Sequence, residues 1–153
     1  RNIQYVVLGS GEWEYENFFR YLHDKYPDKV GITIGFVPDL ARKIYAGADL
    51  FLMPSKSEPC GLSQMVALRY GTLPIVRETG GLKDSITDCG DGHGNGFTFK
   101  TYDAYDMLGA IYRGVDAYNS KDWKVLVKRA LECDMSWGKS ANEYIKMYRS
   151  LLK

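Results

Sequence analysis

Short apolar runs alternate with helix-length segments along this chain, and that alternation restricts the fold more than any other feature. Apolar runs at residues 3–9, 29–36, 49–54, 72–78 and 96–100 predict strands, and segments with helical spacing of apolar residues lie between them. Parallel strands need crossover connections, and strands buried on both faces read as solid apolar runs. The sequence therefore predicts an α/β fold, a Rossmann-like doubly wound parallel sheet.

The pattern changes after the last predicted strand. Residues 102–153 carry three successive helical faces, so we expect the chain to end in helices. No linker, repeat or low-complexity tract interrupts residues 1–153. We therefore treat 1–153 as one domain with terminal helices 102–153.

Two of the predicted helices have clear end signals. One begins at Pro38, with Asp39 as its N-cap, and can end at Gly47. Another runs from Gly61 to Tyr70, with Gly71 as its stop signal. Its predicted buried residues are Leu62, Met65 and Val66.

Composition argues against several classes of partner. Twenty Lys and Arg against nineteen Asp and Glu leave a net charge of +1, and no long basic run is available to follow a nucleic-acid backbone. Asp49 interrupts the most apolar segment, so no membrane span is predicted. The three widely spaced cysteines form neither a disulfide framework nor a zinc set, which favours a reducing, cytoplasmic location.

Ligands in such folds bind outside the carboxyl ends of the strands. Four loops lie at those ends, and we expect them to converge on one edge: Gly9 to Gly11, Gly35 to Asp39, Pro54 to Ser63 and Glu78 to Leu82. In the first loop, Glu14 stands where a dinucleotide fingerprint needs a third glycine, so a plain tight turn is the stronger reading. Phe36 can lie against a base or pack in the core.

The stretch "SEPCGLS" is the richest of the four loops. Pro59 suits the first helical position, which places Glu58 at or near the N-cap and leaves the amides of Cys60, Gly61, Leu62 and Ser63 free for an anionic or hydroxyl-rich ligand. A carboxylate there gains about 0.3–1 kcal/mol from the helix dipole, which also explains Glu58 as an ordinary cap. Thr79, Gly80, Gly81 and Leu82 repeat the arrangement before another helix.

Competing chemistries have weaker support. His23 and His93 are far apart in sequence and do not form a zinc pattern, so no metal is predicted. Cys60 could be a nucleophile, but no histidine lies in the four loops to activate it, and Ser57 and Ser63 lack a base for the same reason.

The segment from Ala48 to Ile86, with "EPCGL" followed by "ALRYGTLPIVRETGGL", resembles the bacterial glycogen synthase and plant starch synthase family of retaining glucosyltransferases. The match continues through "GNGFTF" and "DMSWGKSANEYIKMYRSLL" and covers nearly the whole chain. The resemblance implies the C-terminal, sugar-nucleotide-binding half of a GT-B fold. It also implies a cytoplasmic protein, or a plastid one in a plant.

Roles follow from this resemblance. Glu58 matches the glutamate that stabilises charge at the anomeric carbon, while Cys60 and Gly61 match amides that contact the glucose hydroxyls. Pro59 belongs to the same motif. The remaining matches are Leu62 and Ser63 near the distal phosphate and ribose, Phe36 beside the base, Gly9 and Gly11 lining the nucleotide cleft, and Thr79, Gly80, Gly81 and Leu82 beside the sugar and diphosphate. Gly35, which precedes Phe36, is also a candidate substrate-binding residue.

The resemblance also implies the reaction. Glucose would pass from ADP-glucose or UDP-glucose to the non-reducing end of an α-1,4-glucan with retention and without a cofactor. Many relatives with this architecture have a second glutamate eight positions after the first, where this chain has Val66. Glu58 is therefore the only candidate acid in the motif, and departure of the nucleotide on the same face fits better than a covalent intermediate.

One family feature is missing from the sequence. The family's second domain normally begins with a further strand and a loop that carries an arginine and a lysine for the phosphates, and nothing before Arg1 supplies them. We expect this chain alone to be inactive and prone to self-association, with the glucan bound through a missing N-terminal domain. The alternatives are another GT-B glycosyltransferase, such as a sucrose-forming or trehalose-forming one, and a non-catalytic glucan-binding or regulatory module that uses Trp13, Trp123 or Trp137.

Overall fold

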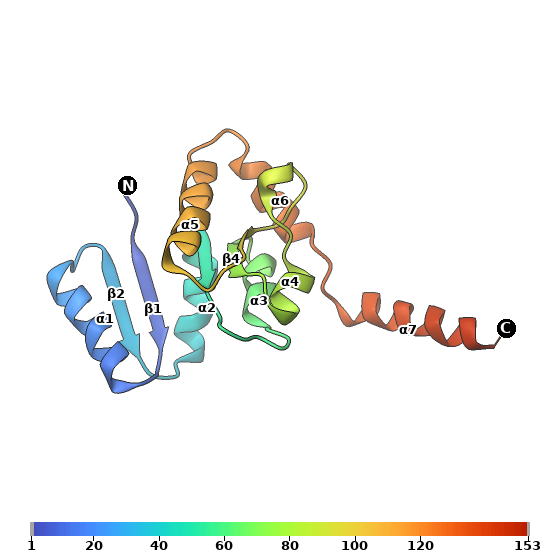
Figure 1. The fold of residues 1–153 in the computed structure, drawn as a ribbon, viewed down its shortest axis with the longest axis horizontal. Coiled ribbons are helices and arrows are strands. Elements are labelled where there is room, and N and C mark those ends of the chain that lie inside the picture. Colours follow the sequence, from blue (N-terminus) through green and yellow to red (C-terminus); the bar gives the residue numbers. More distant parts are fainter. Residues whose placement is uncertain (1, 153) are drawn as a thin grey trace. The chain divides into compact units, whose positions relative to one another are not determined.

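The structure is a computed structural model that describes residues 2–152, without the side chain of Asp91. The chain forms two compact units, Arg1–Gly47 and Ala48–Lys153. Each unit has its own parallel sheet (Figure 1).

The first unit contains β1 (Tyr5–Gly9), α1 (Trp13–Lys25), β2 (Val30–Ile34) and α2 (Pro38–Gly47). β1 and β2 pair in parallel, and α1 packs against β2. The prediction that Asp39 caps α2 is wrong, because the helix already begins at Pro38, whose fixed φ suits a first helical position. Asp39 instead lies in the first turn, 3.3 Å from the guanidinium of Arg42.

The second unit has a three-stranded parallel sheet in the order β3-β4-β5. Its strands are β3 (Leu50–Met53), β4 (Leu73–Arg77) and β5 (Phe97–Phe99), and its helices are α3 (Ser63–Arg69), α4 (Gly80–Ser85), the 3-10 turn η1 (Cys89–Asp91), α5 (Ala104–Tyr118), α6 (Trp123–Glu132) and α7 (Trp137–Leu151). α7 extends away from the rest of this unit in Figure 1, and none of its residues is buried.

The main core of the described residues lies in the second unit, around β4. The first four residues of β4 are buried, as expected for a central parallel strand. Helices α5 and α6 pack against the sheet, and α5 comes so close at Gly114 that a Cβ there would lie 3.2 Å from the side chain of Leu50. This compact core fixes the ends of β3 and β4, from which the candidate site is built.

The predicted stop of α3 at Gly71 is confirmed. Gly71 has φ +79°, and its N–H donates to Leu68 O at 2.9 Å. The N–H of Thr72 donates to Ala67 O at 3.0 Å, which completes a Schellman motif. The chain can then enter β4 directly.

All named strand pairs in residues 2–152 are parallel, which confirms the predicted α/β class. In a 3-2-1-4-5-6 order, omission of strand 1 leaves two groups of neighbouring strands, 3-2 and 4-5-6. The two observed sheets, β1-β2 and β3-β4-β5, have the same neighbours. Among the described helices, none has the length and apolar character to cross a lipid bilayer.

Candidate functional site

The candidate site is built on the carboxyl ends of two neighbouring strands. β3 ends at Met53 and β4 ends at Arg77, and the register pairs Met53 with Val76. The loop after β3 carries Glu58, Pro59, Cys60 and Gly61, and we call it the first loop. The turn after β4 carries Thr79 and leads into Gly80 and Gly81, the first two residues of α4, and we call this segment the second loop. Adjacent parallel strands therefore deliver both loops to the same edge of the sheet.

These two loops touch through their backbones. The N–H of Gly81 donates to Glu58 O at 3.1 Å. A Cβ added to Gly80 would lie 2.1 Å from Glu58 O, and one added to Gly81 would lie 1.9 Å from Cys60 O. Glycine is therefore required at both positions, and the predicted convergence of these two loops is confirmed.

Arg77, which sequence reasoning missed, holds the start of the first loop. Its Nε donates to Ser55 O at 2.9 Å, a terminal nitrogen donates to Lys56 O, and the guanidinium lies 5.7 Å from the ring centre of Tyr102. Ser55 Oγ makes a weak contact of 3.5 Å with the half-buried carboxylate of Glu58. An arginine at the end of an otherwise apolar buried strand was the signal that could have identified this role.

The start of α3 differs from the prediction. The helix begins at Ser63 rather than at Pro59 or Gly61, so Glu58 is not an N-cap. Gly61 has φ +72°, a left-handed conformation that cannot continue into a right-handed helix. Leu62, predicted to be buried, is 67% exposed, and Gln64 takes the inward position instead.

Several main-chain donors in these loops have no partner among the residues that the structure describes. Within residues 2–152, no acceptor contacts the N–H groups of Cys60, Gly61, Leu62, Ser63 and Gly80. Such donors suit phosphate, carboxylate or hydroxyl oxygens. Leu82 is different, because its side chain is fully buried and its N–H donates to Thr79 O at 3.1 Å, so it anchors the second loop.

The glycines predicted in the first unit lie together, at the carboxyl ends of β1 and β2. The N–H of Gly35 donates to Gly9 O at 2.9 Å, and that of Gly11 donates to Glu16 Oε1 at 3.0 Å. Phe36 follows Gly35 and is 91% exposed, so it does not pack in a core. The structure thus joins these residues in one unit and the Glu58 and Thr79 loops in the other; a site shared by all four loops stays a prediction.

Two residues named for alternative functions, His23 and Trp123, have structural partners. Nδ1 of His23 donates to Val30 O at 2.6 Å, which ties α1 to β2. Trp123, named as a surface aromatic, is half-buried and packs edge-on against Tyr118 with ring centres 5.2 Å apart. In the part of the chain that the structure describes, no three His, Cys, Asp or Glu side chains gather to hold a metal ion.

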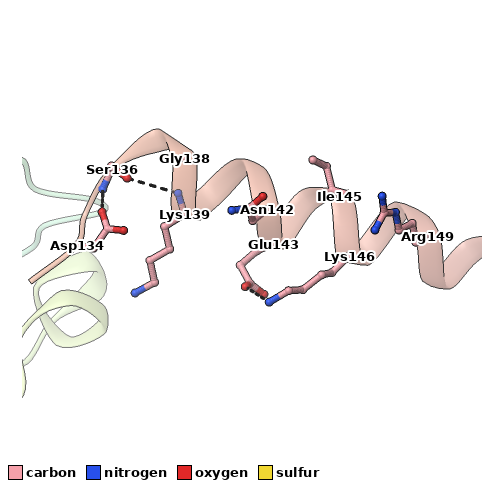
Figure 2. Close-up of a pocket in the computed structure, with 9 residues that line it drawn as sticks. All are labelled: Asp134, Ser136, Gly138, Lys139, Asn142, Glu143, Ile145, Lys146 and Arg149. Carbon is pink, nitrogen blue, oxygen red and sulfur yellow. Dashed lines mark hydrogen bonds and ion pairs between the residues drawn. The ribbon is translucent and has the colours of Figure 1, made fainter.

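A hollow beside α7 is lined by residues between Asp134 and Arg149. Figure 2 shows its polar lining, in which Glu143 pairs with Lys146 at 2.7 Å and Ser136 Oγ accepts from the N–H of Lys139. It contains none of the predicted site residues. The sheet-edge loops therefore remain the candidate site.

Several known proteins are similar to this chain. Residues 1–122 match the family described as glycosyl transferases group 1. The chain is 52% identical to a glycogen synthase of Bacillus cereus (strain ATCC 10987 / NRS 248) over 99% of this chain and 33% of that protein. It is 53% identical to a glycogen synthase of Geobacillus thermodenitrificans over 99% of this chain and 32% of that protein.

A solved structure extends the likeness to three dimensions. The catalytic domain of starch synthase IV from Arabidopsis thaliana, bound to ADP and acarbose, superposes with a TM-score of 0.85 and 38% identity over 98% of this chain and 33% of that one. The predicted resemblance and the GT-B type of fold are confirmed. The chain spans about one third of the length of these relatives.

Proposed function

We propose a function from the premise that this chain belongs to the family of glycosyl transferases group 1. In this proposal the chain is the donor-binding part of a glycogen or starch synthase type of glucosyltransferase. The observation that carries it is the backbone contact between Glu58 and Gly81, which joins the segment that holds Glu58 to one whose N–H groups include some without an acceptor in residues 2–152.

The two kinds of group suit two parts of a sugar nucleotide. Main-chain N–H donors complement the oxygens of a diphosphate and the hydroxyls of glucose. The bond that breaks joins the anomeric carbon to the distal phosphate, and that carbon becomes cationic as the nucleotide leaves. Glu58, as a negative group in the first loop, would stabilise this charge.

The donor is proposed to be ADP-glucose or UDP-glucose. A relative whose structure holds ADP supports a nucleoside diphosphate at this site. In the first unit, the exposed ring of Phe36 beside Gly35 is our candidate for contact with the base. Gly9 and Gly11 are proposed to line the nucleotide cleft, since no atom lies within 4 Å of a Cβ added to either residue.

The stereochemical course is proposed to be retention. Ordinary retaining glycosidases use two carboxylates, one as the nucleophile. Val66, which is partly exposed on α3, occupies the position where many relatives have a second acid, so a covalent intermediate there has no support. A phosphate oxygen of the departing nucleotide is proposed to take the acceptor's proton.

The acceptor is proposed to be an α-1,4-glucan, bound by parts of the protein outside residues 1–153. The glycogen synthase relatives, about three times as long as this chain, support this division. We place the reaction in the cytoplasm and expect residues 1–153 alone to turn over negligibly.

The test replaces Glu58 in the full-length protein. Glu58→Ala and Glu58→Gln should lower the rate of glucose transfer to maltooligosaccharides by about 100- to 1,000-fold, because stabilisation of the developing charge is lost. Initial rates with ADP-glucose and UDP-glucose measure the effect and identify the donor. Glu132→Gln, an exposed acid at the end of α6, is the matched control and should keep the wild-type rate.

Two results would contradict the proposal. Glucose transfer near the wild-type rate in both Glu58 variants would show that Glu58 does not stabilise the charge on the anomeric carbon. Calorimetric binding of maltooligosaccharide without binding of ADP, UDP or their glucose esters would favour a non-catalytic glucan-binding module. Transfer to fructose 6-phosphate or glucose 6-phosphate in preference to a glucan would favour a sucrose-forming or trehalose-forming enzyme.

A further inference from the structure

A fully buried polar side chain lies behind the two loops of the candidate site. Gln64, in the first turn of α3, has 0% of its surface exposed. A buried amide is costly unless its donors and acceptors are paired. Its partners therefore indicate what it is there to hold.

The amide nitrogen of Gln64 contacts the first loop directly and is connected to the second loop through Ser85, the last residue of α4. It donates to Gly61 O at 2.9 Å and lies 3.4 Å from Cys60 O, both in the first loop. It also donates to Ser85 Oγ at 3.1 Å, and Ser85 Oγ donates in turn to Gly81 O at 2.6 Å in the second loop. One side chain and one hydroxyl thus connect three carbonyl groups.

These partners fix which way the amide group of Gln64 points. A flipped amide would place Oε1 against carbonyl oxygens, which repel it. Oε1 consequently has no partner among residues 2–152, although it is buried. A Cβ on Gly61 would lie 2.6 Å from Oε1 and would displace the Gln64 amide, and the φ of +72° favours glycine at this position in any case.

The direction of a carbonyl also sets the direction of the next N–H. In a planar trans peptide the C=O and the following N–H point to opposite sides. When Cys60 O and Gly61 O face Gln64, the N–H groups of Gly61 and Leu62 face away from it. Both are among the N–H groups that lack an acceptor in residues 2–152.

We propose that Gln64, with Ser85 as its relay, is a positioning residue that aims the N–H groups of Gly61 and Leu62 at the sugar and distal phosphate of the donor. This role rests on the proposed function. It differs from that of Glu58, because Gln64 is buried and acts only through the loop backbones.

The test compares two ligands in the full-length protein. Gln64→Leu keeps the approximate volume and removes the donor. It should raise the Kd of the sugar nucleotide, ADP-glucose or UDP-glucose, by about tenfold, as expected for loss of oriented hydrogen bonds. The Kd of AMP or UMP, which lack the glucose and the distal phosphate, should change less than about twofold. In transfer assays the same change should appear mainly as a higher KM for the donor.

Thr72→Val is the matched control. Thr72 is also buried, and its Oγ1 donates to Ala48 O at 2.9 Å, but it precedes β4 and so lies at the opposite edge of the sheet. Both variants lose a buried hydrogen bond, and thermal melting measures that shared loss. Only Gln64→Leu should change the ratio of the two dissociation constants.

Ser85 supplies a second, milder variant if Gln64→Leu does not fold. Ser85→Ala should raise the Kd of the sugar nucleotide by about threefold and leave the Kd of AMP or UMP unchanged. Ser85→Thr keeps the hydroxyl and should bind the sugar nucleotide with the Kd of the unsubstituted protein. The positioning role would be overturned if Gln64→Leu left the ratio of the two dissociation constants unchanged, or if Thr72→Val changed that ratio equally. Where Gln64→Leu cannot be measured, the absence of any effect of Ser85→Ala would overturn it. If the unsubstituted protein binds neither sugar nucleotide, the proposed function fails, and the positioning role fails with it.

Discussion

The two compact units hold their glycine-rich loops in opposite ways. In the second unit, Gly80 and Gly81 lie against the backbone of Glu58 and Cys60, with no room for a Cβ. In the first unit, a Cβ on Gly9, Gly11 or Gly35 would meet nothing within 4 Å. In the second unit, glycine is thus required for folding. In the first unit, packing does not require glycine at Gly9 or Gly11, so any requirement there must have another cause.

The second unit also has more buried residues than the first unit. The second unit closes a core of buried residues around β4, which includes Leu68, Leu73, Ile75 and Leu82. In the described part of the first unit, Val30 alone is a buried hydrophobic residue. Glu58 is therefore attached to a well-packed unit, and substitutions in the first unit should remove fewer buried contacts.

The largest expected effect tests this difference in packing. Leu82→Ala should lower the free energy of unfolding of the second unit by about 3 kcal/mol, because it empties a fully buried site next to the loops. Leu8→Ala, at a half-buried position in β1, should cost the first unit about 1 kcal/mol. Hydrogen exchange of the strand amides, followed separately for β4 and β1, measures both. Equal losses would show that the two units are equally well packed.

A second pair of variants tests the glycines themselves. Gly81→Ala should destabilise the second unit by about 2 kcal/mol or more, since its Cβ would lie 1.9 Å from Cys60 O and the loops must separate. Gly11→Ala should change stability by less than about 0.5 kcal/mol, because the space is open and the backbone is not left-handed. Urea titration followed by circular dichroism gives both values. A tolerated Gly81→Ala would mean that the two loops are not locked together.

Gly11→Ala also separates fold from function. If its stability is unchanged and its affinity for the sugar nucleotide falls, the glycine serves the ligand. If neither changes, Gly11 is part of an ordinary turn. The same substitution is uninformative at Gly81, where packing and binding would be lost together.

Local signals explain what could be predicted from the sequence. The order of strands and helices followed from apolar periodicity, and the end of α3 followed from Gly71, whose left-handed φ permits the Schellman bonds. The contact between the Glu58 and Thr79 loops followed from parallel strands that share an edge. Each of these depends on a residue's own conformation or on sheet topology.

Tertiary partners explain what could not be predicted. Pro59 resembled a first helical residue, but the left-handed Gly61 delays the helix to Ser63. That delay turns Leu62 outward and Gln64 inward, so an apolar face drawn from spacing alone is wrong there. Arg77 donates to carbonyls 22 and 21 residues away, and Gln64 donates to the hydroxyl of Ser85, 21 residues away, so the partners themselves are not set by local sequence.

The smallest expected effect contrasts a carboxylate from each unit. In the second unit, burial opposes ionisation of Asp88, but N–H donors from Thr98 and Gly90 and the guanidinium of Arg113, 2.7 Å away, together lower its pKa. In the first unit, Asp39 and Arg42 form an exposed pair at 3.3 Å. Only the Asp88 cluster should contribute measurable stability, of about 1 kcal/mol.

The sign of the pH dependence follows from the lowered pKa. The folded state holds the proton of Asp88 less tightly than the unfolded state, so its contribution is complete above the ordinary aspartate pKa of about 3.9 and is lost as the pH falls through the lower, folded value. Asp88→Asn should therefore reduce stability at pH 7 and flatten the decline between about pH 5 and pH 3. Urea titrations across that range measure it, and Asp39→Asn, which removes an exposed carboxylate instead, is the matched control. A curve for Asp88→Asn that runs parallel to that of the unsubstituted protein would show that the Asp88 cluster adds no pH-dependent stability, and the contrast between the units would then rest on packing alone.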